Sequence, residues 1–328
     1  MHISVIIPVY NAAATLPSCL DALFACDYGD YEVLVVDDGS TDRSREIAGC
    51  YPCRLLALPR NVGAARAKNH GAEAASGEVL FFTDADIRVP HETLSWIAED
   101  LADPEVDGVV GLLAEHCPYD NFGSQFKNLW MHYTYRRQPR RVGLFFTSAA
   151  AIRRRVFMAE GGFDPHYVGA SITEDIEFGQ RLLTKGYCIV MDQRLMVEHD
   201  KHYSATQVLR TDLLRARGLI LTWLRNRMNK RAHYASVPWF FGAGVLALGC
   251  ATLSAILAII LKEPRVLYAT LGCVIGALLL NAPFLAALWR WRGVGFGLLS
   301  GAFLLADLYA SGLGIALGIL DLARGRRY

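Results

Sequence analysis

Two carboxylates separated by one residue, Asp84 and Asp86, are the side chains whose spacing points most directly to chemistry. They come at the end of the apolar run Val79–Thr83, which has the length and composition of a buried strand. Hard cations such as Mg²⁺ and Mn²⁺ prefer oxygen ligands and are often held by one or two carboxylates together with substrate phosphates. The pair therefore predicts a site for a metal-bound diphosphate, although a solvated turn after a strand would show the same tripeptide.

The elements that must position these carboxylates are strand-like apolar runs alternating with helical patterns. We expect strands over Ile3–Val9, Glu32–Val36, Arg54–Leu58, Val79–Thr83 and Gly108–Leu113, and helices over Ala12–Phe24 and Asn61–Ala75. This alternation predicts an α/β domain with a mainly parallel sheet covered by helices on both faces. Ligands of such sheets bind at the carboxyl ends of the strands. The polar residues at those ends are Tyr10, Asn11, Asp37, Asp38, Asp84 and Asp86.

The turn after the first strand excludes two common ways of binding phosphate. It reads Pro8-Val9-Tyr10-Asn11-Ala12-Ala13, without the glycines of a dinucleotide fold, and no phosphate-loop motif occurs in the chain. We therefore expect the phosphates to be held by a metal at Asp86, assisted by a cation such as Arg66 or Lys68.

Several short motifs follow one another in an order that resembles the inverting family 2 glycosyltransferases, which have the GT-A fold. They are Val5-Ile6-Ile7-Pro8-Val9-Tyr10-Asn11, Val35-Val36-Asp37-Asp38-Gly39-Ser40-Thr41-Asp42, Asn61-Val62-Gly63-Ala64-Ala65-Arg66-Ala67-Lys68-Asn69, Asp84-Ala85-Asp86, Gly161-Gly162-Phe163-Asp164 and Thr173-Glu174-Asp175. The resemblance covers about residues 1–215 and rests on the motifs together.

The resemblance implies a role for each matching residue. The donor nucleotide sugar, expected to be UDP-linked, would be bound by Pro8, Tyr10, Asn11, Asp38, Arg66, Lys68, Asp84 and Ala85. Asp86 would bind Mg²⁺ or Mn²⁺, and His199 would complete the metal site unless it is structural. Asp175 would be the catalytic base, with Glu174 raising its pKa by like-charge repulsion. The alternative for Thr173-Glu174-Asp175 is a capped helix N-terminus, and both interpretations are compatible.

Contacts to the acceptor or the diphosphate are expected at Thr147, Ser148, Gln207 and Arg210. The last two belong to Gln207-Val208-Leu209-Arg210-Thr211, which resembles the Gln-x-x-Arg-Trp of processive family members except that Thr211 replaces the tryptophan. This departure argues against polymer synthesis and favours transfer of a single sugar.

The last part of the chain is apolar and predicts a membrane module. Spans are expected over 236–261, 266–289 and 293–320, because uncharged runs of this length can cross a hydrocarbon core of about 30 Å. The third run contains Asp307, which is more compatible with a helix-facing than a lipid-facing position. Three full spans would place the basic C-terminus on the side of the membrane opposite the other basic loops, against the preference for positive charges on the cytoplasmic side. The alternative is that the third run is re-entrant or interfacial.

The expected domains are a catalytic domain over 1–203, a basic amphipathic helix over 204–235 and the membrane module over 236–328. The middle segment either lies on the membrane surface or connects the domains with a solvated charged face. The first residues lack the pattern of a signal peptide, so we expect the catalytic domain in the cytoplasm and the chain in the inner cell membrane. A net charge of +1 gives no case for nucleic-acid binding.

These observations predict a membrane-anchored enzyme that moves one sugar from a nucleotide-sugar donor to a lipid or lipid-linked acceptor. A processive polysaccharide synthase and a membrane scaffold or transport subunit that binds the nucleotide sugar without turnover are the alternatives. A sugar nucleotidylyltransferase is disfavoured, because it would need a glycine-rich, arginine-containing loop after the first strand.

Overall fold

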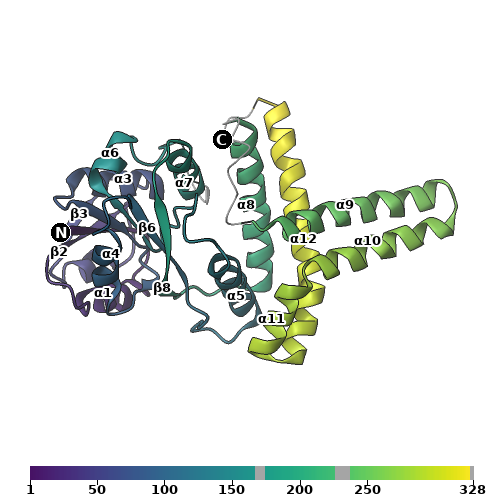
Figure 1. Ribbon diagram of the computed structural model, residues 1–328, viewed down its shortest axis with the longest axis horizontal. Helices are drawn as coiled ribbons and strands as arrows, with labels where there is room; N and C mark the ends of the chain where they lie inside the picture. Colours follow the sequence, from purple (N-terminus) through teal and green to yellow (C-terminus); the bar gives the residue numbers. More distant parts are fainter. Residues whose placement is uncertain (167–173, 226–236, 326–328) are drawn as a thin grey trace.

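The computed structural model describes residues 1–166, 174–225 and 237–325. It contains an α/β domain with a set of long helices on one side of it (Figure 1). Thr173, to which the sequence assigned a helix cap, and the last part of the predicted basic helix, 226–235, lie outside the described residues.

The α/β domain is built on one eight-stranded sheet with the order β3-β2-β1-β4-β7-β6-β8-β5. The strands are β1 (Ile3–Val9), β2 (Tyr31–Asp37), β3 (Arg54–Ala57), β4 (Val79–Phe82), β5 (Ile87–Arg88), β6 (Gly108–Leu113), β7 (Ala150–Arg153) and β8 (Ile189–His199). β7 runs antiparallel to both its neighbours, β4 and β6, and β5 runs antiparallel to β8. The sheet is therefore mixed, but its other four pairings are parallel, so the prediction of a mainly parallel sheet is confirmed.

Helices cover the sheet and carry several of the candidate site residues. They are α1 (Leu16–Phe24), α2 (Ser44–Ala48), α3 (Ala64–Ala74), α4 (Thr93–Asp100), α6 (Arg154–Ala159) and α7 (Glu174–Thr184). β1 and β6 begin and end where the sequence predicted, whereas α1 begins at Leu16 and α3 at Ala64, later than expected. Pro17 lies in the first turn of α1, where a residue without an N–H costs no helical hydrogen bond.

The core beneath the site is aromatic. Phe82 at the end of β4 packs against Phe157 and Phe163, with ring centroids 5.1 and 5.3 Å apart. Phe178 of α7 contacts Phe163 at 5.0 Å. These fully buried rings fix the start of α7 relative to the end of β4. The two segments that carry the predicted carboxylates are thus held by one packed cluster.

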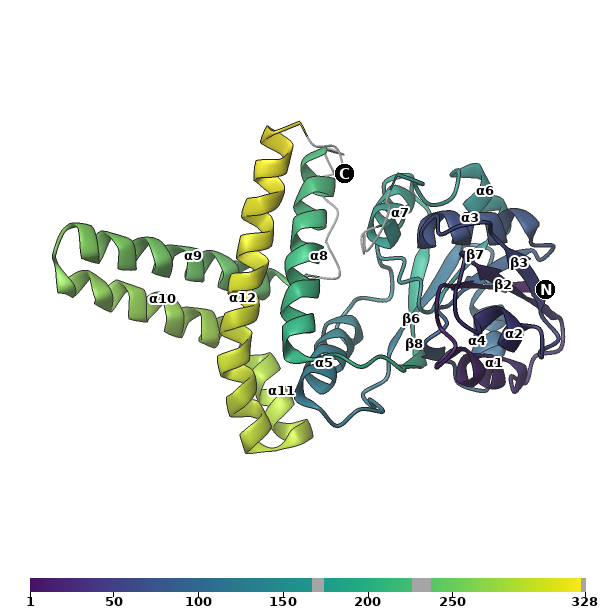
Figure 2. The same cartoon turned by 180° about the vertical axis from the view of Figure 1, so that it is seen from behind.

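Two long helices, α8 (Ala205–Arg225) and α12 (Val294–Ala323), lie side by side in both views (Figures 1 and 2). Gly314 and Gly318 allow this close approach, because a Cβ on either would overlap α8 at Leu213 and Ile220. Arg217 of α8 also donates a hydrogen bond of 2.6 Å from its Nε to Oδ2 of Asp321. The predicted interfacial helix is therefore packed along its length on the last apolar helix.

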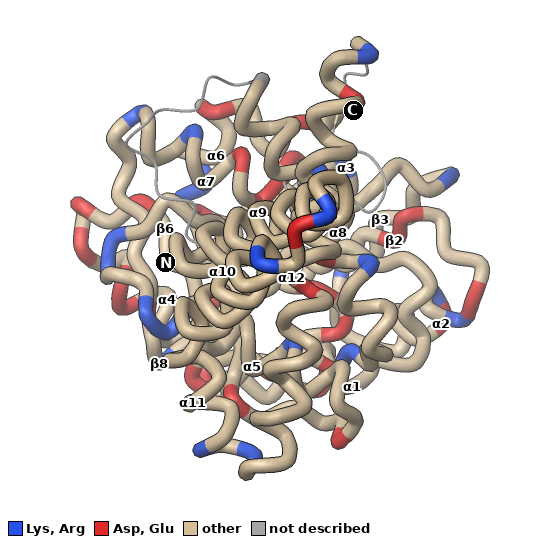
Figure 3. The backbone as a smooth tube through the Cα atoms, turned by 90° about the vertical axis from the view of Figure 1, so that its right-hand side faces the viewer, with Lys and Arg blue, Asp and Glu red and all other residues tan. Residues whose placement is uncertain are grey.

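The remaining helices are α9 (Trp239–Ile260), the 3₁₀ turn η1 (Pro264–Val266), α10 (Leu267–Leu280) and α11 (Ala282–Arg292). α9 and α10 form a hairpin that projects away from the α8–α12 pair (Figure 1). Seen from that side, the charged residues of the turn between them stand at the hairpin tip (Figure 3).

The second predicted span, 266–289, is not one straight helix. α10 and α11 are bent by 57° at Asn281, where Pro283 opens the second helix and lacks the N–H that would continue the ladder. Among the described residues, two helices, α9 and α12, are long and apolar enough to cross a membrane, or three if the bent pair counts as one span. The three-span topology stays a prediction.

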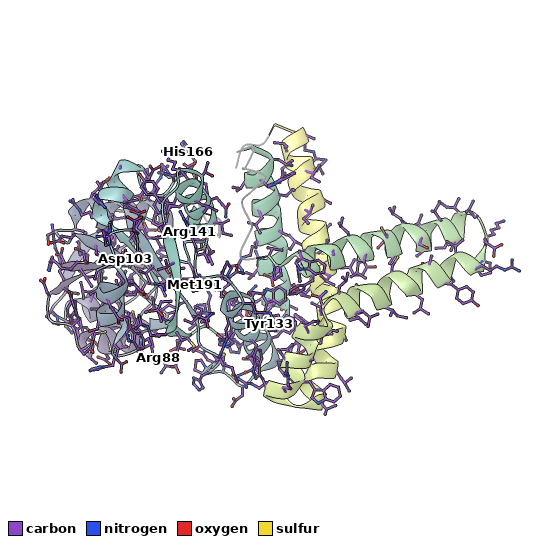
Figure 4. All side chains as sticks on the ribbon, in the orientation of Figure 1. Arg88, Asp103, Tyr133, Arg141, His166 and Met191 are labelled. Atoms are coloured by element: carbon purple, nitrogen blue, oxygen red, sulfur yellow. The ribbon has the colours of Figure 1, made fainter. Side chains whose placement is uncertain are left out.

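Helix α5 (Phe122–Arg136) joins the two halves of the molecule. Tyr133, labelled in Figure 4, lies on this helix with its ring centroid 5.2 Å from that of Phe284 in α11. Trp130 contacts the same ring at 4.8 Å, and Phe126 contacts Phe303 of α12 at 4.8 Å. The catalytic part of the chain and the apolar helices therefore share a continuous aromatic core.

Candidate active site

The pair Asp84 and Asp86 lies where the sequence placed it, in the turn that follows β4, with Ala85 buried between them. β5 begins at the next residue, Ile87, which pairs with His199 of β8. This register brings Nε2 of His199 to 3.3 Å from Oδ2 of Asp86. The short strand β5 is thus the element that joins the two predicted metal ligands.

The pKa of Asp86 lies below its ordinary value. Burial acts to raise this pKa, but the hydrogen bond with His199 and the positive charge of Lys201, whose Nζ is 3.9 Å away, lower it more. Asp86 is therefore ionised at neutral pH, as a metal ligand must be. Lys201 was not among the predicted site residues.

The donor set fits a divalent cation that is shared with a substrate. Asp86 supplies a carboxylate and His199 an imidazole, and no group of three or more His, Cys, Asp or Glu side chains in the described residues is arranged to hold a metal ion. Two protein ligands leave the other positions of a hard cation to water and phosphate oxygens. This is the arrangement expected where the cation and the diphosphate bind together.

A buried lysine lies at the centre of the other half of the site. Lys68 of α3 is only 2% exposed, and its Nζ donates a hydrogen bond of 2.6 Å to Oγ1 of Thr147. The same Nζ lies 3.9 Å from Oδ1 of Asp84 and 3.8 Å from Oε1 of Glu174. Lys68 thereby connects α3, the segment before β7 and the start of α7.

Ser148 orients the first carboxylate of the pair. Its Oγ donates a hydrogen bond of 2.7 Å to Oδ2 of Asp84. Thr147 and Ser148, expected to contact the acceptor or the diphosphate, are therefore in the site, where both contact residues on the donor side. Their role toward a substrate stays a prediction.

Asp175 lies in the first turn of α7, next to Glu174. Burial and the negative charge of Glu174 raise the pKa of Asp175 to about 7, although Lys68 and Arg215 act to lower it. Its Oδ1 accepts a hydrogen bond of 2.7 Å from the N–H of Ile176. A carboxyl group with this pKa is suited to proton transfer near neutral pH.

The residues expected to bind the nucleotide lie at the carboxyl ends of β1 and β2. Tyr10 is 51% exposed, so its ring is available for stacking on a base. Asn11 has a left-handed backbone with φ of 52°, and its Oδ1 accepts a hydrogen bond of 2.8 Å from the N–H of Thr41. Pro8 is the last but one residue of β1 and is partly exposed.

Asp38 has a structural function that the motif did not reveal. Its two carboxylate oxygens accept hydrogen bonds from the N–H groups of Val62 at 2.7 Å and Gly63 at 2.9 Å. These groups lie just before α3, so the carboxylate fixes the start of the helix that carries Lys68. Each oxygen keeps a free lone pair, and the expected contact with the nucleotide stays a prediction.

Three further candidates lie at the edge of this arrangement. Arg66 is exposed and donates a hydrogen bond of 3.1 Å from Nε to the carbonyl of Pro165. Gln207 closes a capping box at the start of α8, where its Oε1 accepts the N–H of Ser204 at 2.7 Å. Arg210 is exposed on the same helix. The contacts of these residues in the described part of the chain do not include Asp86 or Asp175.

Sequence reasoning missed Arg215 as a site residue, because it interpreted the basic residues of this segment as facing lipid headgroups or solvent. In the structure Arg215 of α8 is half-buried, and it influences the titration of Asp175 and Tyr135. The available signal was Asp212, an acidic residue one helical turn before Arg215 in an otherwise basic amphipathic segment.

The fold is of the GT-A type, with acidic residues at the strand ends and a carboxyl group at a helix start. Residues 4–161 match the model of glycosyl transferase family 2. The chain therefore carries a family 2 glycosyltransferase domain, as its motifs indicated.

Known proteins agree with this assignment. The chain is similar to the glycosyltransferase AglE of Haloferax volcanii, with 29% identity over 254 residues that cover 72% of this chain and 79% of AglE. Its fold is similar to that of the mannosyltransferase PcManGT from Pyrobaculum calidifontis, solved with GDP-Man and Mn²⁺, at a TM-score of 0.60 and 23% identity, covering 96% of this chain and 86% of that one. It is also similar to residues 1–349 of TarS from S. aureus, solved with UDP, at a TM-score of 0.51 and 18% identity, covering 99% of this chain and 92% of that one.

Proposed function

We propose that this protein is a membrane-anchored, inverting glycosyltransferase. It moves one sugar from a nucleotide-sugar donor, UDP-linked as the family resemblance implies, to a lipid or lipid-linked acceptor at the cytoplasmic face of the inner membrane. The observation that carries the proposal is the position of Asp175. Its carboxyl group has a pKa of about 7. The neighbouring residue Glu174 lies near Lys68, and the same lysine lies near Asp84, the carboxylate on the donor side.

The chemistry follows from a carboxylate base opposite a leaving diphosphate. Asp175 accepts the proton of the acceptor hydroxyl while the acceptor oxygen forms a bond to the anomeric carbon. The bond between that carbon and the diphosphate oxygen breaks, and the nucleoside diphosphate leaves with the electron pair. Attack from the face opposite the leaving group inverts the configuration at the anomeric carbon.

Mg²⁺ or Mn²⁺, held by Asp86 and His199, would offset the negative charge that builds on the departing diphosphate. Mn²⁺ in the PcManGT structure supports a divalent cation in this fold. The nucleotides in the two related structures differ, GDP-Man in one and UDP in the other, so the donor must be found by experiment.

Two lysine side chains of the protein would also offset the negative charge of the diphosphate. Lys68 lies near Asp84 and Glu174 and keeps two acidic side chains in a fixed arrangement when the donor is absent. Lys201 lies on the metal side, near Asp86. The positive charges of both lysines would attract an anionic donor toward the carboxyl ends of the strands.

The test is donor turnover by the full chain purified in detergent. A panel of UDP- and GDP-linked sugars is incubated with Mn²⁺ or Mg²⁺, first alone and then with membrane lipid extract, and released nucleotide and glycosylated lipid are measured. We expect one donor to be hydrolysed slowly and to be transferred once lipid is added. Saturable binding of a donor without any turnover, even with lipid, would favour a binding subunit. Products that grow to many sugars would favour a processive synthase.

A further inference from the structure

A cavity of about 340 Å³ lies between α8, α9 and α12. Its walls are largely apolar and include Trp130, Leu219, Phe241 and Ile315, while its polar lining comes from Asp212, Arg215 and Asp307. Two of the three helices, α9 and α12, are those long and apolar enough to cross a membrane. The cavity is therefore mostly apolar, and two of its charged side chains, Asp212 and Arg215, lie one helical turn apart on α8.

The charged groups in this cavity are unequally paired. Lys127 of α5 forms an ion pair with Asp212 of α8. Arg217, also on α8, is paired with Asp321 of α12. Arg215 stands between these two pairs along α8, and no ion pair within the described residues involves it. Its Nε is shielded from solvent and has no hydrogen-bond partner there. The Nε–H of this half-buried guanidinium is therefore a donor available to an anion that enters the cavity.

Arg215 also connects the cavity to the candidate base. It lines the cavity, and its charge is close enough to Asp175 to influence the titration of that carboxyl group. An anion bound to Arg215 would therefore lie near the group that receives the acceptor's proton. Lys127 neutralises Asp212, and this reduces the repulsion between Asp212 and an anion that approaches Arg215.

We propose that this cavity holds the hydrocarbon chain of the acceptor lipid, and that Arg215 binds the lipid's phosphate group. The proposal rests on the function proposed above, since it names the acceptor class of the same site. The apolar walls exclude water from the chain, and the guanidinium binds phosphate in the bidentate manner for which arginine is suited. The partner is thus a single-chain lipid phosphate whose phosphate group lies beside Arg215.

Two glycines of α9 supply a matched pair of variants. Gly242 lines the cavity, and a Cβ built on it meets no atom within 4 Å. Gly249, two turns further along the same helix, has equally open surroundings but does not line the cavity. Gly242→Leu therefore occupies the cavity without a clash at its Cβ, and Gly249→Leu controls for the added side chain. Both changes favour helix formation.

The experiment measures retention of radiolabelled hexadecyl phosphate by the full chain in mixed micelles, beside hexadecanol and inorganic phosphate. We expect saturable binding of hexadecyl phosphate and at least about tenfold weaker binding of the alcohol and of inorganic phosphate. Arg215→Gln should reduce phosphate-lipid binding to the level of the alcohol. Gly242→Leu should weaken binding of both lipids about tenfold, while Gly249→Leu should leave binding unchanged.

Equal binding of hexadecyl phosphate and hexadecanol, unaffected by Arg215→Gln, would overturn the assignment of the phosphate. Equal effects of Gly242→Leu and Gly249→Leu would overturn the assignment of the cavity. Donor hydrolysis without lipid is measured on every variant, and both glycine variants should leave it unchanged, because neither glycine belongs to the candidate active site. Lipid binding as expected, with no turnover of any nucleotide sugar, would contradict the proposed function alone. Turnover without this binding pattern would contradict the lipid site alone.

Discussion

His199 and Asp86 come within 3.3 Å of each other because Ile87 pairs with His199 across the antiparallel β5–β8 ladder. A ladder fixes side-chain positions more firmly than a loop does, so the two candidate metal ligands are held in position without a bound cation. The pairing also orients the imidazole toward the carboxylate.

The first prediction concerns this pair. Removing the imidazole by His199→Ala should raise the Mn²⁺ concentration for half-maximal donor hydrolysis by about tenfold or more, and Asp86→Ala should abolish hydrolysis. The measurement is a metal titration of released nucleotide at saturating donor. His202→Ala is the control, because His202 is exposed and its ring packs on Tyr119, with centroids 5.3 Å apart. An unchanged metal requirement in His199→Ala would remove His199 from the metal site.

The second prediction concerns the base. Asp175→Asn keeps the size of the side chain and removes its ability to accept a proton, so transfer to the acceptor should fall by about 10²- to 10⁴-fold. Donor affinity should change little, which is measured by competition of the nucleotide in a binding assay. Near-normal transfer by this variant would mean that another group acts as the base.

The third prediction concerns pH. The base works only when deprotonated, and the pKa of Asp175 is raised to about 7, so kcat/KM should fall as pH decreases below that value and level off above it. Glu174→Gln removes a negative charge that raises this pKa and should move the acidic limb to lower pH. Lys68→Met removes a positive charge that lowers this pKa and should move the limb to higher pH. Profiles of all three proteins that superimpose would contradict the assignment of the limb to Asp175.

The fourth prediction concerns the stability of the site. Lys68→Met leaves Asp84 and Glu174 without their common cation in a buried place, and should lower the free energy of unfolding by about 3 kcal/mol. Arg43→Met is the control, because Arg43 and Glu46 are both largely exposed and their ion pair of 2.9 Å lies on the surface. Surface pairs contribute less than about 1 kcal/mol. Chemical denaturation followed by tryptophan fluorescence distinguishes the two values, and equal losses would contradict the structural role of Lys68.

The fifth prediction concerns the contact between α8 and α12. Gly314→Leu places a side chain against the backbone of Leu213 and should destabilise the protein by about 1 to 3 kcal/mol, seen as a lower Tm in detergent. Gly301→Leu, on the same helix but with open surroundings, should leave Tm close to that of the unaltered protein. Equal Tm values for the two variants would mean that α8 does not pack this closely on α12.

Much of the α/β domain could be predicted from the sequence. The runs Ile3–Val9 and Gly108–Leu113 are continuous and apolar because they form buried strands, and their limits coincide with β1 and β6. The acidic residues fall at the strand ends because alternating strands and helices place those ends at one edge of a parallel region. Local patterns of this kind contain the information that the prediction needs.

What could not be predicted depends on contacts distant in sequence. β7 runs antiparallel between β4 and β6, which periodicity cannot show. β5 has only two residues, too few for any pattern, yet it joins Asp86 to His199. The burial of Arg215 requires the packing of α8 on α12, and the basic segment alone is equally compatible with a surface helix.

Helix α5 carries a further consequence, for the design of shortened versions of this protein. Nearly every side chain from Gly123 to Tyr135 is buried, and the rings of Phe126, Trp130 and Tyr133 are covered by helices that follow residue 280. A fragment ending before α9 would present these rings to water and should aggregate. The apolar helices are thus also part of the folding core, and the α/β domain cannot be transplanted onto other helices without rebuilding that surface.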